Sequence, residues 1–219
     1  MVGAAGTPSI LATSVSAGEC DLIELRLDLL GCGAPVREFA ERHRRRFPIL
    51  LTARHPGEGG RPPGDPETRR AALLEMLPAA AAIDLELQSI GELAAVWNEA
   101  RRLRLLRVAS FHDFTGAPPP ATLLDTIDSM HRAAADVAKL AFRIDRPAGL
   151  LQLADLLQTT PPLPLAVMGM GPLAPSSRLL AAQLGSVLNY GYLGDVPTAP
   201  GQWPARLLLE ALKASGCRQ

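Results

Sequence analysis

Cysteine is scarce in this sequence, which has only Cys20, Cys32 and Cys217 in 219 residues. Their number is odd, and no two of them form a CxxC pair. This pattern argues against a disulfide framework and against a zinc site built from thiolates. We therefore expect three ordinary reduced thiols.

Long apolar runs and basic tracts are also missing. No apolar run reaches the roughly 18 residues that a membrane-spanning helix needs, and segment 1–15 lacks the basic start of a signal peptide. The formal net charge is zero and no basic stripe is interleaved with aromatic residues, so the charge pattern does not favour nucleic-acid binding. The sequence predicts a cytoplasmic protein that binds neither membrane nor nucleic acid and whose partner is a small neutral or anionic molecule.

Lysine is the rarer of the two strong cations: of 22 lysine and arginine residues, only Lys139 and Lys213 are lysines. Lys139 lies in the apolar segment AADVAKLAF, in phase with Val137 and Ala141. Burial disfavours the charged form of a lysine and can leave a free amine, which attacks ketones. The alternative is a lysine whose amino group reaches solvent or pairs with a carboxylate such as Asp136. The scarcity of lysine favours the first interpretation.

Short apolar runs alternate with helix-compatible segments almost from end to end of the chain. This alternation predicts a parallel sheet with crossover helices, and eight such units close most readily into a (β/α)8 TIM barrel of the α/β class. A doubly wound open sheet is the alternative, but no GxGxxG turn opens a helix here. Because the composition does not shift along the chain, we expect residues 1–219 to form a single catalytic barrel domain. The expected strands are 9–15, 21–28, 48–54, 81–87, 105–112, 136–142, 163–170 and 186–193; the expected helices are 66–77, 90–103, 121–134, 148–157, 178–184 and 203–214, with a first link, 17–20, too short for a helix.

Charged side chains fall on strands that should be apolar. Glu24, Arg26 and Asp28 alternate with Leu25 and Leu27 in one expected strand. A parallel strand that is covered on both faces is normally apolar, so three charges in phase are costly unless they face a polar cavity. We expect such a cavity at the carboxyl ends of the strands, where active sites of barrels assemble.

Three further expected strands deliver polar residues to the same end of the barrel: Arg54, Glu86 and His112. A histidine with a pKa near neutrality can take up a proton and return it within one turnover, which suits His112 to an elimination beside a carbonyl. The alternative for His112 is a hydrogen bond to a backbone carbonyl. His43 and His131 are expected on solvent-facing surfaces. Since no pair of histidines has the spacing of metal ligands, we expect no metal.

Two glycine-rich segments follow expected strands. Segment 52–60, TARHPGEGG, places Glu58 in a loop where glycine allows close approach of the backbone to a ligand. The glycine-rich run before Arg178 places a guanidinium where it can grip a carboxylate with two hydrogen bonds. Segment 194–204 has the length and composition of a lid that closes over a substrate. A flexible turn and a plain surface loop are the simpler alternatives for the first and last of these.

Six motifs together resemble type I 3-dehydroquinate dehydratase, in the order of that family and over nearly the whole chain. They are ELRLD (24–28), TxRxxxEGG (52–60), SFHDFTGAP (110–118), DVAKLA (136–141), MGxGxxxxSR (169–178) and TAPGQ (198–202). The resemblance implies a barrel enzyme, commonly a homodimer, that converts 3-dehydroquinate to 3-dehydroshikimate in the shikimate pathway with neither metal nor organic cofactor.

The resemblance also implies roles for individual residues. Lys139 matches the lysine that forms a Schiff base with the substrate ketone, His112 matches the general acid and base, and Glu58 matches the carboxylate that positions the histidine. The implied substrate contacts are Glu24, Arg26 and Arg54 at the ring hydroxyls, Arg178 at the carboxylate, Thr198 and Gln202 in the lid, and Thr13 near the end of the first strand.

Two other functions are compatible with the same pattern. Another Schiff-base barrel, of the aldolase or transaldolase type, would share Lys139 and could use Arg178 to hold the phosphate of a sugar. A catalytically silent barrel that binds a metabolite is the second alternative. The presence of a lysine, a histidine and a carboxylate together favours an enzyme over a silent barrel.

Overall fold

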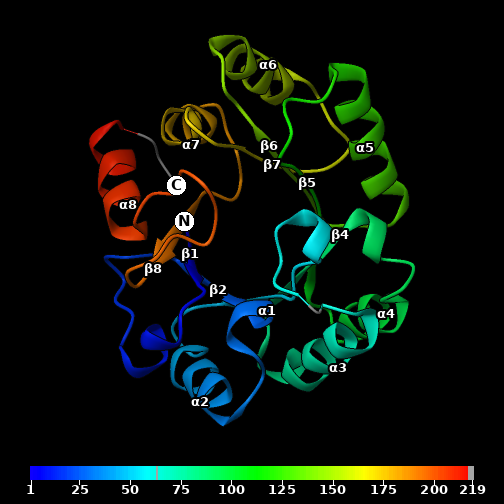
Figure 1. The fold of residues 1–219 in the computed structure, drawn as a ribbon, viewed down its shortest axis with the longest axis vertical. Coiled ribbons are helices and arrows are strands. Elements are labelled where there is room, and N and C mark those ends of the chain that lie inside the picture. Colours follow the sequence, from blue (N-terminus) through cyan, green and yellow to red (C-terminus); the bar gives the residue numbers. More distant parts are fainter. Residues whose placement is uncertain (63, 217–219) are drawn as a thin grey trace.

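The computed structural model describes residues 1–62 and 64–216, and their strands form one sheet (Figure 1). All eight strands are parallel, in the spatial order β7-β6-β5-β4-β3-β2-β1-β8. The first strand of the chain, β1, pairs with the last, β8, and the other strands follow β1 in chain order, as in a barrel. The predicted (β/α)8 TIM-barrel class is confirmed. The strands are β1 (Val2–Ala5), β2 (Leu22–Arg26), β3 (Ile49–Thr52), β4 (Ala82–Glu86), β5 (Leu106–Asp113), β6 (Val137–Arg143), β7 (Leu165–Met170) and β8 (Tyr190–Leu193).

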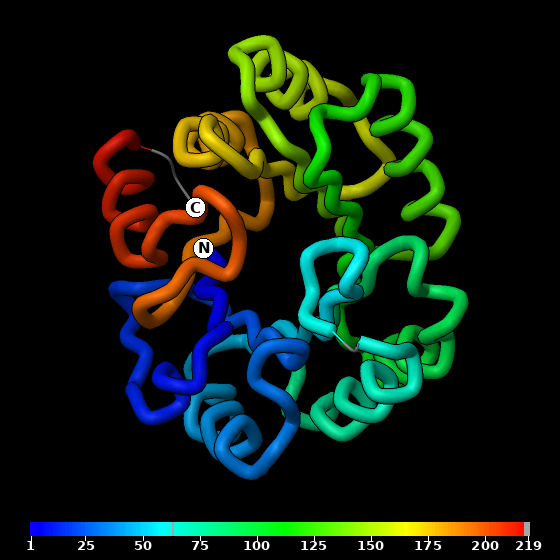
Figure 2. Tube along the Cα trace, in the orientation of Figure 1, coloured from blue at the N-terminus to red at the C-terminus, as the bar shows by residue number. Residues whose placement is uncertain are grey.

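The helices surround the strands in chain order, and the colours of Figure 2 run once round the molecule from blue to red. None of the helices in residues 1–62 and 64–216 has the length and apolar character of a membrane-spanning helix. The α-helices are α1 (Leu27–Leu30), α2 (Ala34–His43), α3 (Pro66–Met76), α4 (Ala94–Arg102), α5 (Pro120–Arg132), α6 (Pro147–Gln158), α7 (Ala174–Gln183) and α8 (Ala205–Ala214); the 3-10 helices are η1 (Pro8–Ala12), η2 (Pro56–Glu58), η3 (Leu77–Ala79) and η4 (Leu87–Ser89).

Strands β7 and β8 stand at the two ends of the strand order, and the segment just before β8 hydrogen-bonds to β7. The Ser186 hydroxyl accepts a hydrogen bond from the Val167 backbone N–H at 3.0 Å. One backbone bond, from Val187 N–H to the Leu165 carbonyl at 2.9 Å, lies beside it. These two bonds link β7 to the segment that leads into β8, and the serine satisfies a backbone N–H of β7.

Alternation along each strand separates an outer core from the barrel interior, as β4 illustrates. Ile83 and Leu85 belong to the large apolar core between the sheet and the helices. Ala82 belongs to a second apolar cluster inside the barrel, and Asp84 and Glu86 continue this inner face toward the carboxyl end of the strand. The interior is therefore apolar at one end and charged at the other, which is where a site is expected.

The predicted first strand at 9–15 is wrong. The first strand is Val2–Ala5, and Pro8–Ala12 forms a 3-10 helix whose first residue is a proline. Proline fixes φ near the helical value and lacks an N–H, so it favours the first turn of a helix over a central strand. Thr13 ends this helix, is exposed, and donates its hydroxyl hydrogen to the Ile10 carbonyl at 2.9 Å. Thr13 therefore does not lie at the end of a barrel strand.

The helix α2 was not predicted, and His43 at its end is not on the surface as expected. His43 is only 5% exposed, since Val36, Phe39 and Ala40 lie on the same helix face, buried against the sheet. Its Nε2 accepts a hydrogen bond from the Val15 backbone N–H at 3.1 Å, and its Nδ1 contacts the Phe39 carbonyl at 2.9 Å. Both ring nitrogens thus have hydrogen-bond partners, which offset the free-energy cost of burying the imidazole in the core.

Two helix starts differ by four residues from the predicted ones. The helix expected at 178–184 begins at Ala174, because Pro175 occupies its first turn, where a missing N–H carries no penalty. The helix expected at 90–103 begins at Ala94, after a turn that follows η4. The first of these differences places Arg178 inside α7 instead of at its start.

The described cysteines are free thiols, as expected. Burial raises the pKa of Cys20 to about 12, and burial also raises the pKa of Cys32. Neither thiol is therefore a reactive thiolate near neutral pH. Cys217 lies outside the described residues.

Candidate active site

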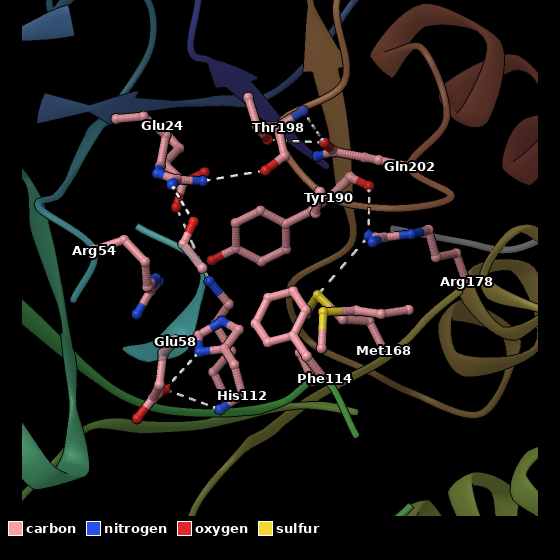
Figure 3. A pocket seen from close by; sticks show the side chains of 16 residues that line it. Glu24, Arg54, Glu58, His112, Phe114, Met168, Arg178, Tyr190, Thr198 and Gln202 are labelled. Carbon is pink, nitrogen blue, oxygen red and sulfur yellow. Dashed lines mark hydrogen bonds and ion pairs between the residues drawn. The ribbon is translucent and has the colours of Figure 1, made fainter. Parts of the chain in front are cut away.

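One pocket at the carboxyl ends of the strands contains nine of the ten predicted site residues, and Figure 3 shows it from close by. Thr13 is the exception, since it caps η1 outside the barrel. Most of the nine come from strand ends or from the loops that follow them. The nine are Glu24, Arg26, Arg54, Glu58, His112, Lys139, Arg178, Thr198 and Gln202.

Lys139 lies on the inner face of β6, and its amine faces other charged groups. Its Nζ donates a hydrogen bond to Asp84 Oδ2 at 2.7 Å and lies 3.9 Å from Glu24 Oε1. The same Nζ lies 4.2 Å from the centroid of the Tyr190 ring. Two carboxylates and a ring face surround the nitrogen, so the pocket is built to hold a positive charge at this position.

The solvent-facing alternative for Lys139 is wrong, because the residue is only 4% exposed. Asp136 is not its partner either: the Asp136 carboxylate accepts a hydrogen bond from the Arg107 backbone N–H at 2.8 Å. The lysine does pair with a carboxylate, but that carboxylate is Asp84, which lies deeper in the barrel. The apolar segment AADVAKLAF thus places its lysine among charged groups of other strands.

Asp84 is the charged residue that the sequence analysis missed. It is fully buried and accepts hydrogen bonds from Lys139 and from the Ser110 hydroxyl, the latter at 2.6 Å. Burial opposes its ionisation, but the positive charges of Arg54 and Lys139 outweigh burial and hold the pKa of Asp84 below its ordinary value. Asp84 lies two residues before Glu86 in the segment IDLEL, so alternation placed both on the inner face.

Arg54 forms ion pairs with two carboxylates, Asp84 and Glu86, at the floor of the pocket. Its guanidinium lies 2.9 Å from Asp84 Oδ1 and donates to Glu86 Oε1 at 2.7 Å. Burial would lower the pKa of Arg54, but Asp84 and Glu86 more than reverse this and raise it. Arg69 of α3 donates to the other oxygen of Glu86 and to the Ala53 carbonyl. This chain of ion pairs ties the outer helix α3 to the pocket.

His112 and Glu58 form a second pair. Glu58 Oε2 lies 2.9 Å from His112 Nδ1 and accepts the His112 backbone N–H at 2.9 Å, while Gln88 donates to Glu58 Oε1 at 2.8 Å. Burial raises the pKa of Glu58 to about 7. Burial, with the charges of Arg54 and Lys139, holds the pKa of His112 well below its ordinary value. The imidazole is therefore neutral near pH 7 and can act as a base.

Glycines explain how the loop after β3 brings Glu58 back over the pocket. Gly59 has a φ of +85°, in the left-handed region that L side chains rarely adopt. A Cβ at Gly60 would lie 1.9 Å from the Arg54 carbonyl oxygen, so only glycine fits there. The simpler reading of this segment as a flexible turn is not supported, because Glu58 is buried and hydrogen-bonded.

Arg178 is a buried cation in contact with backbone and sulfur. Its Nη1 donates to the Tyr190 carbonyl at 2.9 Å and lies 3.8 Å from Met168 Sδ. Burial lowers the pKa of Arg178 to about 10, and its Nε has no hydrogen-bond partner among the described residues. A buried guanidinium with a free N–H is suited to bind an anion, because the anion supplies the missing partner and charge.

The predicted lid, 194–204, contacts the site. The Thr198 backbone N–H and hydroxyl both donate to Gln202 Oε1, at 2.9 and 2.8 Å. Arg26 donates to the Thr198 carbonyl at 3.3 Å and pairs with Asp28 through two hydrogen bonds, at 2.9 and 2.7 Å. The loop therefore lies over the mouth of the pocket, held there by a residue at the end of β2. The sequence predicts Asp28 on a strand, but Asp28 lies in α1.

Comparison with known proteins decides the family. The family model of type I 3-dehydroquinase matches residues 9–218. The chain belongs to the type I 3-dehydroquinase family. This confirms the resemblance drawn from the six motifs, and it places the protein among enzymes of the hydro-lyase class.

Relatives in this family match over most of their length. The 3-dehydroquinate dehydratase of Methanothrix thermoacetophila is 33% identical over 208 residues, covering 95% of this chain and 88% of the relative. The crystal structure of 3-dehydroquinate dehydratase from Geobacillus kaustophilus has a TM-score of 0.76 at 27% identity and covers 97% of this chain and 91% of that one. The structure from Enterococcus faecalis has a TM-score of 0.77 at 27% identity and covers 87% of each chain.

Several pocket residues of this type I 3-dehydroquinase were not singled out from the sequence. Phe114 follows His112 by two positions, and Met168, Met170 and Tyr190 lie on the inner faces of β7 and β8. Apolar side chains on a strand look like ordinary core residues, so nothing in the sequence separates them from the outer core. Only their position on the inner face, which depends on the register of the whole barrel, reveals them.

Proposed function

We propose that this enzyme dehydrates 3-dehydroquinate to 3-dehydroshikimate, within the shikimate pathway, through a Schiff base at Lys139. The observation that carries the proposal is that the Lys139 amine and the His112 imidazole line one pocket. They come from neighbouring strands, and Lys139 pairs in register with Ser110, two residues before His112. An amine nucleophile and a neutral base are thus held on the same inner face, as an elimination beside a ketone requires.

The first step joins Lys139 to the substrate. The Lys139 ammonium gives up a proton, its Nζ attacks the ketone carbon as the free amine, and the carbonyl oxygen leaves as water with two of the three ammonium protons; ammonium and ketone thus give iminium and water. The positive charge of the iminium stands where the ammonium stood, 2.7 Å from Asp84 Oδ2 in the free enzyme. The countercharge is in place before the reaction begins, so no reorganisation is needed as the iminium forms.

The second step eliminates water. His112 removes a proton from the carbon beside the iminium, and the electron pair of that C–H bond delocalises onto nitrogen as an enamine. The enamine expels the hydroxyl, which receives the proton from His112, and hydrolysis of the product imine releases the amine. Ionised Glu58 accepts a hydrogen bond from His112 Nδ1–H, with 2.9 Å between Oε2 and Nδ1, and this tautomer leaves Nε2 free to take a proton from the substrate.

The remaining site residues are proposed to bind the substrate. Arg178, whose Nε has no hydrogen-bond partner within residues 1–62 and 64–216, binds the carboxylate; Arg54 and Glu24 face the ring hydroxyls, with Arg26 beside them. Thr198 and Gln202 close the pocket as part of the lid and exclude water from the imine. Thr13 is not included, since it lies away from the pocket.

The assembly and location of the enzyme stay predictions. A homodimer is expected from the family resemblance, and a cytoplasmic location from the composition. The chain as a whole, residues 1–219, is proposed to act as one catalytic domain.

The test is a direct assay with purified protein and 3-dehydroquinate, following the conjugated enone of the product by its ultraviolet absorbance. The proposal predicts turnover that chelators do not change. Sugar phosphates of the aldolase type serve as the comparison substrates. Cleavage of those compounds without dehydration of 3-dehydroquinate would replace this function with the aldolase-type alternative, and binding without any turnover would favour the silent barrel.

A further inference from the structure

Two buried side-chain polar atoms in the described part of the chain have no hydrogen-bond partner: Arg178 Nε and the Tyr190 hydroxyl. Both residues line the active-site pocket. Leaving a buried hydroxyl unpaired costs free energy, so such groups are rare in folded proteins and call for an explanation. The substrate carboxylate proposed to bind Arg178 would supply a partner for Arg178 Nε. The Tyr190 hydroxyl still needs a partner.

The position of Tyr190 is fixed by the barrel. It is the first residue of β8, is 3% exposed, and pairs in register with Val2 of β1. Its carbonyl accepts the hydrogen bond from Arg178. In Figure 3 its ring lies in the middle of the pocket, and its hydroxyl points away from Arg178, toward the side of Arg54.

The ring of Tyr190 lies against the proposed nucleophile, with Lys139 Nζ 4.2 Å from the ring centroid. The ring that carries the free hydroxyl therefore lies beside the nitrogen that would form the new bond. Burial, together with the negative charges of Glu24 and Asp84, raises the pKa of Tyr190, so the hydroxyl keeps its proton and acts as a donor.

The neighbouring carboxylates are already occupied by other donors. The Glu24 carboxylate accepts a hydrogen bond from the Thr52 hydroxyl at 2.8 Å. The Asp84 carboxylate accepts hydrogen bonds from Lys139 Nζ and the Ser110 hydroxyl. The free donor on Tyr190 is thus left for a group that enters the pocket. The acceptor nearest to the attacking amine in a ketone substrate is the carbonyl oxygen itself.

We propose that the Tyr190 hydroxyl donates a hydrogen bond to the substrate oxygen on the carbon that Lys139 attacks. This inference rests on the proposed function and deepens it. As the C–N bond forms, the π electrons of the carbonyl move onto oxygen, and the hydroxyl stabilises the charge that develops there. Overall, the ketone and the lysine ammonium give the iminium and water, so the departing oxygen takes two of the three ammonium protons. Tyr190 keeps its own proton.

The variant Tyr190→Phe tests this, because it removes the hydroxyl and keeps the ring beside Lys139. The rate of imine formation is measured in a single turnover, by quenching with borohydride and weighing the intact protein. We expect this rate to fall by about tenfold or more, as for loss of a donor to developing charge. The variant should melt at the same temperature as the wild type or higher, because it loses no hydrogen bond within the protein.

Tyr192→Phe is the matched control. Tyr192 is the other tyrosine of the chain, lies two residues along β8 and does not line the pocket. It should form the imine at the wild-type rate. If Tyr190→Phe stays within about twofold of wild type, the role of Tyr190 is overturned while the proposed function stands. If the wild type itself forms no adduct, the proposed function fails and this inference fails with it.

A second measurement does not depend on the folding of Tyr190→Phe. In Tyr192→Phe, Tyr190 is the sole tyrosine, and adding Lys139→Ala keeps a bound ketone from reacting. The protein is labelled with ¹³C at the phenol carbon and titrated with 3-dehydroquinate in the NMR spectrometer. A shift of the single phenol signal that saturates with substrate supports the contact, and an unchanged signal under saturating substrate overturns it.

Discussion

Lys139 Nζ and Asp84 Oδ2 lie 2.7 Å apart, in an ion pair that is buried in the barrel between β6 and β4. The pair fixes the amine at the floor of the pocket and supplies the charge that an iminium needs. It also explains how a barrel interior tolerates a lysine, since a buried charge without a partner is strongly destabilising.

Lys139→Ala is expected to abolish turnover, with less than about a thousandth of the wild-type rate remaining, because among the described residues Lys139 is the lysine that lines the pocket. Steady-state assay of the folded variant checks this. The control is Lys213→Ala, which removes the other lysine, an exposed residue of α8, and should leave the rate unchanged. A larger residual rate in Lys139→Ala would rule out the Schiff base.

Asp84→Asn is expected to slow imine formation and to destabilise the fold, since it leaves Lys139 and Arg54 short of a counterion; breaking such pairs costs about 3–5 kcal/mol. Urea denaturation and single-turnover trapping measure the two effects. Wild-type stability and trapping rate in this variant would contradict the role of the pair.

The same carboxylate predicts a pH dependence of stability. Arg54 and Lys139 hold the pKa of Asp84 below its ordinary value despite burial. Its stabilising contribution is therefore present above about pH 4, the pKa of an unfolded aspartate, and is lost as the pH falls through the lower native pKa. The difference in unfolding free energy between wild type and Asp84→Asn should shrink as the pH is lowered below about 4. A difference that stays constant down to acid pH would contradict the lowered pKa.

His112→Ala is expected to accumulate a covalent adduct with 3-dehydroquinate while releasing little product, because the amine remains and the base is gone. Borohydride trapping and product assay on the same sample compare the two steps. The surface histidine variant His131→Ala serves as control, since His131 is exposed on α5. Normal product release by His112→Ala would assign the base to another group.

Glu58 is expected to set the acid limb of the activity profile. Its pKa is raised to about 7 by burial, so its carboxylate form, which orients His112, is present above that pH and is lost below it. A plot of kcat/KM against pH should therefore rise through about pH 7 in the wild type. Glu58→Gln, which cannot ionise, should lower the rate and remove this limb. An identical limb in that variant would show that another group titrates.

The sequence was sufficient to predict the seven strands from β2 to β8, because each lies in a short, mostly apolar segment set off from the helix-compatible segments. It failed at β1, whose four residues, VGAA, are too small and too few to stand out. A Cβ at Gly3 would lie 2.9 Å from Cys20 Sγ, so a larger residue there would force neighbouring side chains to shift. Close packing of that kind depends on residues distant in sequence and leaves no local pattern.

The charged residues of the site were predictable for a similar reason, since charges in phase on a parallel strand conflict with burial unless a cavity is present. Asp84 was missed because it lies deeper than the strand end, although its phase with Glu86 indicated the same face. Tyr190 was missed because a tyrosine in a strand is ordinarily a core residue. Its unpaired hydroxyl becomes visible only when all its neighbours are in place.

The most direct test of the account is intact-protein mass spectrometry after addition of 3-dehydroquinate and sodium borohydride, followed by peptide mapping. The account predicts one adduct of reduced substrate per chain, on the peptide that contains Lys139, and none in Lys139→Ala. A folded, substrate-binding protein that yields no adduct, or an adduct on Lys213, would contradict it.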